Sequence, residues 1–320
     1  MRLSEPRPHV KQALALLPHQ PGVYILRDER GRVIYVGRSR DLATRARSYW
    51  TDLRDRPHLK RMLPRVEWLE PVLCASEHEA AFLESDLLRR HRTWYNRTLG
   101  MESRVWLRLD TQPQAPGLSV IHEADPRDGA TWFGPYLGWE PVRQAATGLL
   151  RLFPLDYAGT AIGRTERELA RSLGVIADDA GHLVTSITSV LRREPSAVRS
   201  ALQGLEAMRD RGAERLMFEW AAEVQEYIRG LIWITQPQKL SALDPVDGDF
   251  GATSGSVRVV ISMRSGRMAQ RHVYPSGGGP RRTGSGGDVE WHELARDNAR
   301  LMSSLTAAGA VGPLGWKPLR

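Results

Sequence analysis

The sequence predicts an α/β protein. Its N-terminal part would form a small domain with a three-stranded antiparallel sheet flanked by helices, and a mainly helical region would follow. Two short strand-like runs separated by a Gly-containing turn predict a β-hairpin near the N-terminus. Farther along, a capping box opens an amphipathic helix, and residues 164–234 read as mainly helical. At 320 residues, the chain is long enough for two or three small domains.

The first domain can be assigned element by element. A short helix, "VKQALALLP", precedes strands at Val23–Arg27 and Val33–Val36, which the turn "DERGR" connects. A helical pattern starts at Asp41, and a third strand covers Val66–Cys74. Ser76 and Glu79 then form the capping box of a helix. Spacings of three and four define the apolar face of that helix: Ala80, Leu83, Leu87 and Leu88.

The rest of the chain divides by composition and pattern. A strand-containing stretch over 104–154 includes "WFGPY" and leads to a helix from Glu140 to Leu152. Residues 247–256 read as a flexible link, 257–275 as a β-hairpin, 276–287 as disordered low-complexity sequence, and 290–305 as an amphipathic helix. The predicted segments are 1–100, 101–160, 161–240, 241–275 and 276–320, with a helical hairpin at 205–231.

The charge is concentrated at the N-terminal end. The chain carries a net charge of +8. Residues 1–100 hold 19 Lys and Arg against 12 Asp and Glu, whereas the remaining residues hold 26 against 25. A basic first domain favours an anionic partner such as nucleic acid. The alternative is that these residues serve only solubility.

One cysteine, Cys74, excludes a disulfide framework and any four-cysteine zinc or iron–sulfur site within this sequence. We expect it to fill a core position. The N-terminus lacks the apolar core of a signal peptide, and no stretch reaches the roughly 20 apolar residues of a membrane span. We therefore expect a soluble, cytoplasmic protein.

Glu84 lies toward the apolar side of the capped helix, where a carboxylate is costly unless it pairs with a cation or binds a metal. A salt bridge to an arginine, such as one on the first helix of the domain, is one interpretation. The other is a Mg²⁺ site in which water supplies most ligands.

Tyrosines and arginines lie on the hairpin and directly after it. Tyr24 and Tyr35 lie on different strands, where aromatic residues usually serve packing. Yet Tyr35 directly precedes Val36-Gly37, where the backbone can approach a ligand closely. Arg45 and Tyr49 share one helix face. The arginines near this strand end form either a solvated basic helix start or a phosphate site: Arg38, Arg40, Arg45 and Arg47.

These residues resemble the GIY-YIG nuclease family. "GVY" (22–24) and "YVG" (35–37) match its two name-giving motifs, and the spacing from Tyr35 to Asn96 agrees. More narrowly, the chain resembles the N-terminal half of UvrC-type excinucleases, including "WFGPYLGWEPVRQAATGLLRLFPL". Residues 205–231 resemble the helical UVR motif through which such proteins contact UvrB. An ordinary helical hairpin is the alternative for that stretch.

The resemblance implies a role for each matching residue. Glu84 would hold one Mg²⁺ or Mn²⁺ ion, and Tyr35 would be the general base toward water. Tyr24 and Tyr49 would orient water and phosphate, and Arg45 would stabilise the transition state. Asn96 would support the site. Gly37, Arg38, Arg40 and Arg47 would bind DNA, and the UVR-like contacts would be Phe218, Glu219, Ala221 and Ala222.

Four departures from the family pattern qualify these expectations. Arg38 replaces the usual Lys, and Gln225-Glu226 replaces the usual Arg-Asp of the UVR motif. The cysteines that hold an iron–sulfur cluster in some members are missing after "LFPL", so no cluster is expected. The chain also shows no second run of catalytic carboxylates. This plan resembles the Cho-type excinucleases, which make only the 3′ incision.

The sequence therefore predicts a monomeric, metal-dependent endonuclease. It would act on double-stranded DNA that carries a lesion, in nucleotide excision repair with a UvrB-like partner. Two alternatives remain open. One is a catalytically weak or inactive DNA-binding adaptor, and the other is a structure-specific nuclease that acts without UvrB.

Overall fold

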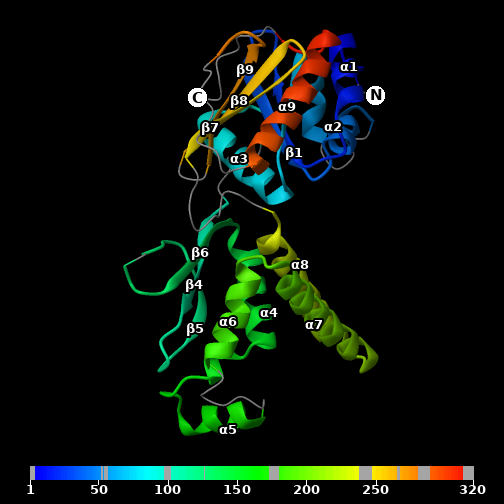
Figure 1. Ribbon diagram of the computed structural model, residues 1–320. Helices are drawn as coiled ribbons and strands as arrows, with labels where there is room; N and C mark the ends of the chain where they lie inside the picture. The colour runs from blue at the N-terminus through cyan, green and yellow to red at the C-terminus, as the bar shows by residue number, and fades with distance from the viewer. Residues whose placement is uncertain are drawn as a thin grey trace. The chain divides into compact units, whose positions relative to one another are not determined.

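The computed structural model describes residues 4–51, 53, 57–96, 102–125, 127–172, 180–237, 247–264, 267–279 and 289–312. The chain forms two compact units. Unit 1 combines Met1–Met101 and Pro237–Leu240 with Asp244–Arg320. Unit 2 comprises Glu102–Gln236 and Ser241–Leu243. Figure 1 shows the two units, with most of their helices and strands labelled.

The first sheet of unit 1 is antiparallel, in the order β2-β1-β3. Its strands are β1 (Gly22–Arg27), β2 (Val33–Ser39) and β3 (Trp68–Leu73). The three strands and their antiparallel arrangement confirm the prediction. Every residue of the central strand β1 is buried, because apolar side chains cover both of its faces.

Helices supply those two covers. On one face, Val23 and Ile25 pack against α3 (Glu77–Arg90). On the other face, Tyr24 and Leu26 join a core that includes α1 (Pro8–Leu16) and α2 (Leu42–Thr51). Two short 3₁₀ helices, Pro57–Arg61 and Leu63–Arg65, precede β3. The sheet is therefore a layer between helices, and residues 23–26 of its central strand are hydrophobic.

The predicted capping box of α3 is present. The Ser76 hydroxyl accepts a hydrogen bond from the Glu79 N–H at 3.1 Å. The Glu79 carboxylate in turn accepts from the Ala75 N–H at 2.8 Å, one residue before the cap. These contacts fix the start of the helix that carries Glu84.

A second antiparallel sheet completes unit 1, in the order β7-β8-β9. It consists of β7 (Gly248–Ser254), β8 (Val257–Arg264) and β9 (Arg267–Pro275). The predicted hairpin at 257–275 is thus confirmed. The prediction of a flexible link at 247–256 was wrong, because β7 pairs with β8 along its whole length. Phe250 gives β7 a buried anchor that outweighs its glycines and polar residues.

Helix α9 (Val289–Ala307) packs against β7 and β8 and contacts α1 and β3 (Figure 1). Trp291, Val259 and Ile261 belong to the same buried core as Leu42 and Leu69. The sequence predicts 241–275 and 276–320 as separate segments, whereas the structure groups the described residues of 244–320 with the N-terminal domain. The predicted disorder at 276–287 falls mostly on residues 280–288, which lie outside the described residues.

Unit 2 begins with an antiparallel sheet in the order β5-β4-β6. Its strands are β4 (Arg104–Asp110), β5 (Gly117–Ile121) and β6 (Thr131–Leu137). The helices follow: α4 (Trp139–Leu152), a 3₁₀ turn at Leu155–Tyr157, α5 (Arg164–Ser172), α6 (Ala180–Leu191), α7 (Pro195–Glu214) and α8 (Phe218–Thr235). Its core joins β4, α4, α7 and α8. None of the described helices combines the length and hydropathy that a membrane crossing requires.

Candidate active site

Three tyrosines from three elements meet in unit 1. Tyr24 comes from β1, Tyr35 from β2 and Tyr49 from α2. The Tyr49 hydroxyl lies 2.5 Å from that of Tyr24 and 3.0 Å from that of Tyr35. Both rings meet the Tyr49 ring edge-on, with centroids 5.7 Å apart. The structure therefore links the three hydroxyls into one hydrogen-bonded chain with Tyr49 in the middle.

Gly37 makes this arrangement possible. The register of the hairpin places Tyr24 directly opposite Gly37. A Cβ atom at position 37 would lie 2.3 Å from the Tyr24 hydroxyl oxygen. Only glycine leaves room for the Tyr24 ring to cross the neighbouring strand. The second motif glycine therefore has a packing reason at this site.

The three tyrosines differ in access to solvent. Tyr24 and Tyr49 are fully buried, whereas Tyr35 is partly exposed. Burial raises the pKa of both Tyr24 and Tyr35 well above the ordinary value, and the Tyr49 hydroxyl raises both further. The nearby Glu84 carboxylate also raises the pKa of Tyr35. In the absence of a cation, both side chains are therefore neutral phenols at physiological pH.

Arg45 adds a positive charge beside the tyrosines. Its guanidinium carbon lies 5.9 Å from the Tyr49 ring centroid. Burial lowers the pKa of Arg45, but the hydroxyls of Tyr49 and Tyr24 more than offset this, so its pKa is raised overall. The site thus keeps a solvent-exposed permanent cation that can bind a phosphate oxygen.

Glu84 approaches the same site from α3. One of its carboxylate oxygens accepts a hydrogen bond from the Arg38 backbone N–H at 3.2 Å. The other lies 3.5 Å from the Arg38 guanidinium. The expected salt bridge therefore exists, but its arginine comes from β2 rather than from the first helix of the domain. Arg38, which occupies the position of the usual lysine, thus contacts the candidate metal ligand Glu84.

A divalent cation fits this site in one way. Among the described residues, no group of three or more His, Cys, Asp or Glu side chains is arranged to hold a metal. The Glu84 side chain is partly exposed, and Mg²⁺ is commonly held by one or two carboxylates while keeping several waters. A hydrated Mg²⁺ or Mn²⁺ on Glu84 is compatible with these residues if the Arg38 side chain moves aside.

Asn96 supports β2 from outside the sheet. Its side chain accepts from the Val36 N–H at 3.0 Å and donates to the Val36 carbonyl at 2.7 Å. The Tyr95 N–H adds a bond of 3.3 Å to the Ile34 carbonyl. Residues 95–96 thereby pair with the edge strand on both sides of Tyr35. The contact by Tyr95 was not predicted, and only its position next to Asn96 could have suggested it.

The remaining arginines have different surroundings. Arg47 donates to the carbonyls of Leu14 and Ala15, at 3.0 Å and 3.3 Å, at the end of α1. Helix α1 has no basic residue in its own last turn, so Arg47 completes that helix end. Arg40 is exposed. A DNA-binding role for Arg40 and Arg47 stays a prediction.

The UVR-like residues lie in unit 2, at the hairpin of α7 and α8. Leu216, Met217 and Phe218 are exposed apolar side chains at its turn. Glu219 and Ala222 are also exposed, and Ala221 is partly buried. Gln225, one of the departures from the family motif, accepts a bond from Arg209 at 2.9 Å. The glutamine thus joins the two helices of the hairpin.

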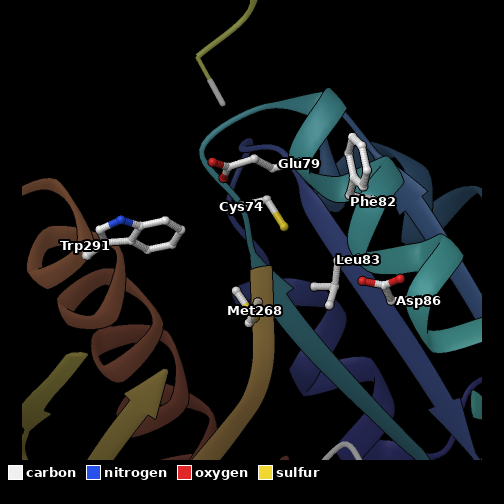
Figure 2. Close-up of a pocket in the computed structure, with 7 residues that line it drawn as sticks. All are labelled: Cys74, Glu79, Phe82, Leu83, Asp86, Met268 and Trp291. Atoms are coloured by element: carbon white, nitrogen blue, oxygen red, sulfur yellow. The ribbon is translucent and has the colours of Figure 1, made fainter. Parts of the chain in front are cut away.

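Unit 1 contains a small cavity of about 20 Å³ among α3, β3, β9 and α9 (Figure 2). Its lining residues are Cys74, Glu79, Phe82, Leu83, Asp86, Met268 and Trp291. A volume of this size holds about one water molecule. Burial raises the pKa of the Cys74 thiol well above its ordinary value. Cys74 is therefore an inert core thiol, as the sequence predicts.

The sequence of this chain is similar to that of known proteins. Residues 20–97 match the family model of the UvrC-like GIY-YIG domain. "UvrABC system protein C" from Symbiobacterium thermophilum is 31% identical over 86% of this chain and 46% of its own length. The protein of the same name from Syntrophotalea carbinolica is 30% identical over 81% of this chain and 45% of its own length. The chain thus spans about half the length of these curated relatives.

A solved structure is also similar over the N-terminal part. It is the GIY-YIG N-terminal endonuclease domain of UvrC from Thermotoga maritima, bound to magnesium. Sequence identity is 31%, the TM-score is 0.26, and the match covers 28% of this chain and 98% of that domain. Residues 20–97 are therefore a GIY-YIG domain of the UvrC type, in a chain that resembles UvrC over most of its length.

Proposed function

We propose that this protein is a DNA endonuclease of nucleotide excision repair. It hydrolyses one phosphodiester on the 3′ side of a lesion, in the cytoplasm, as a monomer that acts with a UvrB-like partner. The observation that carries this proposal is the convergence of the tyrosine hydroxyls, Arg45 and Glu84 at one partly open site. A phosphodiester is the substrate that such a combination of a cation, a carboxylate and hydroxyls suits.

In the proposed mechanism, Tyr35 orients the attacking water, because it is the member of the trio that solvent reaches. It would accept the water's proton as a phenolate, the form that Arg45 and a cation held by Glu84 would favour. Tyr49 holds the Tyr35 hydroxyl in place at 3.0 Å and is itself held by Tyr24 at 2.5 Å. Proton transfer by a positioned side chain contributes about 10²- to 10⁴-fold to a rate.

Arg45 would stabilise the extra negative charge on the phosphate in the transition state. Its permanent charge lies beside the tyrosines, where that negative charge would develop. Glu84 would hold Mg²⁺ or Mn²⁺, which when bound supplies charge neutralisation at the phosphate and the departing 3′-oxygen. Neutralising Glu84 also removes one cause of the raised pKa of Tyr35.

The proposed partners follow from surface properties. The net charge of the first 100 residues suits the DNA backbone, with affinity that falls as salt rises. The exposed apolar turn of the α7–α8 hairpin suits a helical contact with a UvrB-like protein. Both assignments rest on the resemblance to UvrC and on the chemistry of these surfaces.

A specific observation favours one competing function. Arg38 binds the Glu84 carboxylate through both its backbone and its guanidinium. Competition with a cation would make the site catalytically weak, as expected for a DNA-binding adaptor. The Arg38→Lys variant tests this, because a lysine carries a single ammonium group on a shorter side chain and should release Glu84 more readily.

The deciding experiment uses an end-labelled duplex with one bulky adduct, Mg²⁺ or Mn²⁺, and a UvrB protein from the same source. The proposal expects a single cut on the 3′ side that needs UvrB and disappears in Glu84→Gln and Tyr35→Phe. Cutting without UvrB would instead indicate an independent nuclease. DNA binding without metal-dependent cutting by the wild type would support the adaptor, and cutting restored in Arg38→Lys would assign the loss to Arg38.

A further inference from the structure

A groove lies beside the edge strand β2 of unit 1, with a volume of about 580 Å³. Its described lining comes from the first 3₁₀ helix and from the segment after α3: Pro57, His58, Arg61, Trp94, Tyr95 and Asn96. The volume falls within the range of about 300–1,000 Å³ that is typical of small-molecule sites. Its most prominent side chain, Trp94, is not part of the candidate active site.

Trp94 is a large aromatic side chain that is 55% exposed. Two arginines from other segments flank it. The guanidinium carbon of Arg32 lies 4.7 Å from its ring centroid, and that of Arg65 lies 5.9 Å away. Asp28 holds the Arg32 guanidinium at 2.7 Å, so this cation has a fixed orientation. The ring is therefore held in place while much of its surface stays open to solvent.

The charge of this surface is positive. Arg61 and Arg65 are exposed, and the described lining of the groove contains no carboxylate. The Arg61 carbonyl accepts a hydrogen bond from the Tyr95 hydroxyl at 3.2 Å, which ties the 3₁₀ helix to the segment that carries Trp94. Aromatic rings interspersed with arginines in a basic groove are characteristic of surfaces on which the bases of single-stranded nucleic acid stack.

The groove adjoins β2, the strand that carries Tyr35. Tyr95 and Asn96 line it, and the same two residues bond to the backbone of Ile34 and Val36. Those two strand residues flank Tyr35. If a DNA strand places a phosphate at Tyr35 and Arg45, an aromatic surface therefore lies nearby, along the edge of β2.

We propose that this groove binds an unstacked base of the DNA strand to be cut, with the base stacked on Trp94 and nearby phosphates on Arg61 and Arg65. The proposal rests on the proposed function, since it concerns the DNA path next to the same site. It adds a binding residue that recognises a base by its flat face and not by its sequence.

The first test measures binding without cleavage. The full-length protein, in EDTA, is titrated with a fluorescein-labelled single-stranded thymidine oligonucleotide and with an all-abasic strand of the same length. Wild type should bind the base-bearing strand more tightly. Trp94→Ala should weaken that binding about tenfold or more and leave abasic binding unchanged. Trp94→Phe should retain most of the affinity, because it keeps an aromatic face.

Two controls make the result specific. Trp139→Ala removes another exposed tryptophan, from unit 2, and should bind both strands like wild type. Trp94→Leu keeps an apolar side chain without an aromatic ring and should behave like Trp94→Ala. Equal binding of the base-bearing strand by wild type and Trp94→Leu would overturn the proposal. A loss of the same size for the abasic strand would also overturn it.

The second test separates this proposal from the proposed function. In the adduct assay with UvrB, single abasic positions are placed one at a time on the cut strand. One position should slow the wild type about tenfold and have no further effect on Trp94→Ala.

If wild type cuts but neither test depends on Trp94, only the groove proposal fails. If binding depends on Trp94 but wild type never cuts, the proposed function fails. Loss of UvrB binding in Trp94→Ala with unchanged DNA binding would make the groove a protein interface.

Discussion

At the scale of single residues, the candidate site depends on where one hydroxyl lies. Tyr49 is fully buried on α2, yet its oxygen contacts the hydroxyls of both hairpin tyrosines. The solvent-accessible Tyr35 is thus positioned by a residue that no substrate can reach directly. In the proposed mechanism, this arrangement would separate the chemistry, at Tyr35, from the support, at Tyr49 and Tyr24.

Tyr35→Phe should lower the rate of DNA nicking by about 10²- to 10⁴-fold, because it removes the group that accepts the proton. Single-turnover nicking with saturating metal measures this effect. Tyr49→Phe should lower the rate less, since Tyr35 stays in place but loses its hydrogen bond. Tyr274→Phe, a partly buried tyrosine on β9, is the matched control and should cut like wild type. A Tyr35→Phe variant with full activity would contradict the assigned role.

Gly37→Ala should destabilise the protein and abolish nicking together. Its new Cβ would lie 2.3 Å from the Tyr24 hydroxyl, so the Tyr24 ring must leave its position. Overpacking of this kind costs about 1–3 kcal/mol. Urea denaturation gives the loss of stability, and nicking gives the loss of function. Gly181→Ala is the control, because a Cβ there meets no neighbouring atom within 4 Å.

At the scale of elements, α3 carries the candidate metal ligand, and its N-terminal cap sets where the helix begins. The Ser76 hydroxyl and the Glu79 carboxylate each accept a backbone N–H there. Because Glu84 lies on the same helix, fraying of the first turns would loosen its position opposite Arg38. The capping pattern is readable from the sequence, and its consequence for Glu84 depends on the packing of α3 on the sheet.

Ser76→Ala should lower the free energy of unfolding by about 1 kcal/mol, the usual cost of losing an N-cap side chain. Urea denaturation followed by circular dichroism measures it. The control is Ser186→Ala on the exposed side of α6, whose hydroxyl bonds only within its own helix. Equal stabilities of Ser76→Ala and Ser186→Ala would show that the cap contributes nothing.

At the scale of the whole molecule, a buried ionic cluster ties strands of unit 1 that are far apart in sequence. Glu70 on β3 accepts two bonds from Arg27 on β1, at 3.0 Å and 2.9 Å. It also accepts one at 2.7 Å from Arg271 on β9, whose side chain is fully buried. Beside this cluster, Asn298 of α9 bonds to the backbone of Leu73 at the edge of β3. The C-terminal elements thus complete the N-terminal domain.

Glu70→Gln should cost about 3–5 kcal/mol of stability at neutral pH, because it leaves two buried arginines without their carboxylate. Arg271→Met should cost less, since Arg27 still pairs with Glu70. Urea denaturation of both variants measures the difference. The opposite order would mean that Arg271 rather than Glu70 is the centre of the cluster.

The same cluster predicts a pH dependence. Burial raises the pKa of Glu70, but Arg271 and Arg27 outweigh it, so the pKa is lowered in the folded state. The stability from Glu70 is therefore present above the ordinary carboxyl pKa of about 4.3 and is lost as the pH falls through the lowered folded value. Wild type should lose stability below about pH 4 more steeply than Glu70→Gln. Parallel pH curves would contradict this assignment.

The sequence by itself determined the local structure and the set of candidate residues. Alternating and helical spacing, a turn and a cap depend on near neighbours, so the three strands, α3 and the hairpin at 257–275 could be predicted. The tyrosines, Arg45 and Glu84 could be named from their motif positions. The strand β7 could not, because its glycines and polar residues give no strand pattern and only pairing with β8 stabilises it.

Only the tertiary structure decided how these residues meet. It brings Tyr24, Tyr35 and Tyr49 into one hydrogen-bonded chain, pairs Glu84 with Arg38 and directs Arg47 to the end of α1. It also joins the C-terminal sheet to the N-terminal domain through Glu70 and Arg271. Such contacts depend on complementary shape and charge between segments as much as 225 positions apart, and local periodicity carries no record of them.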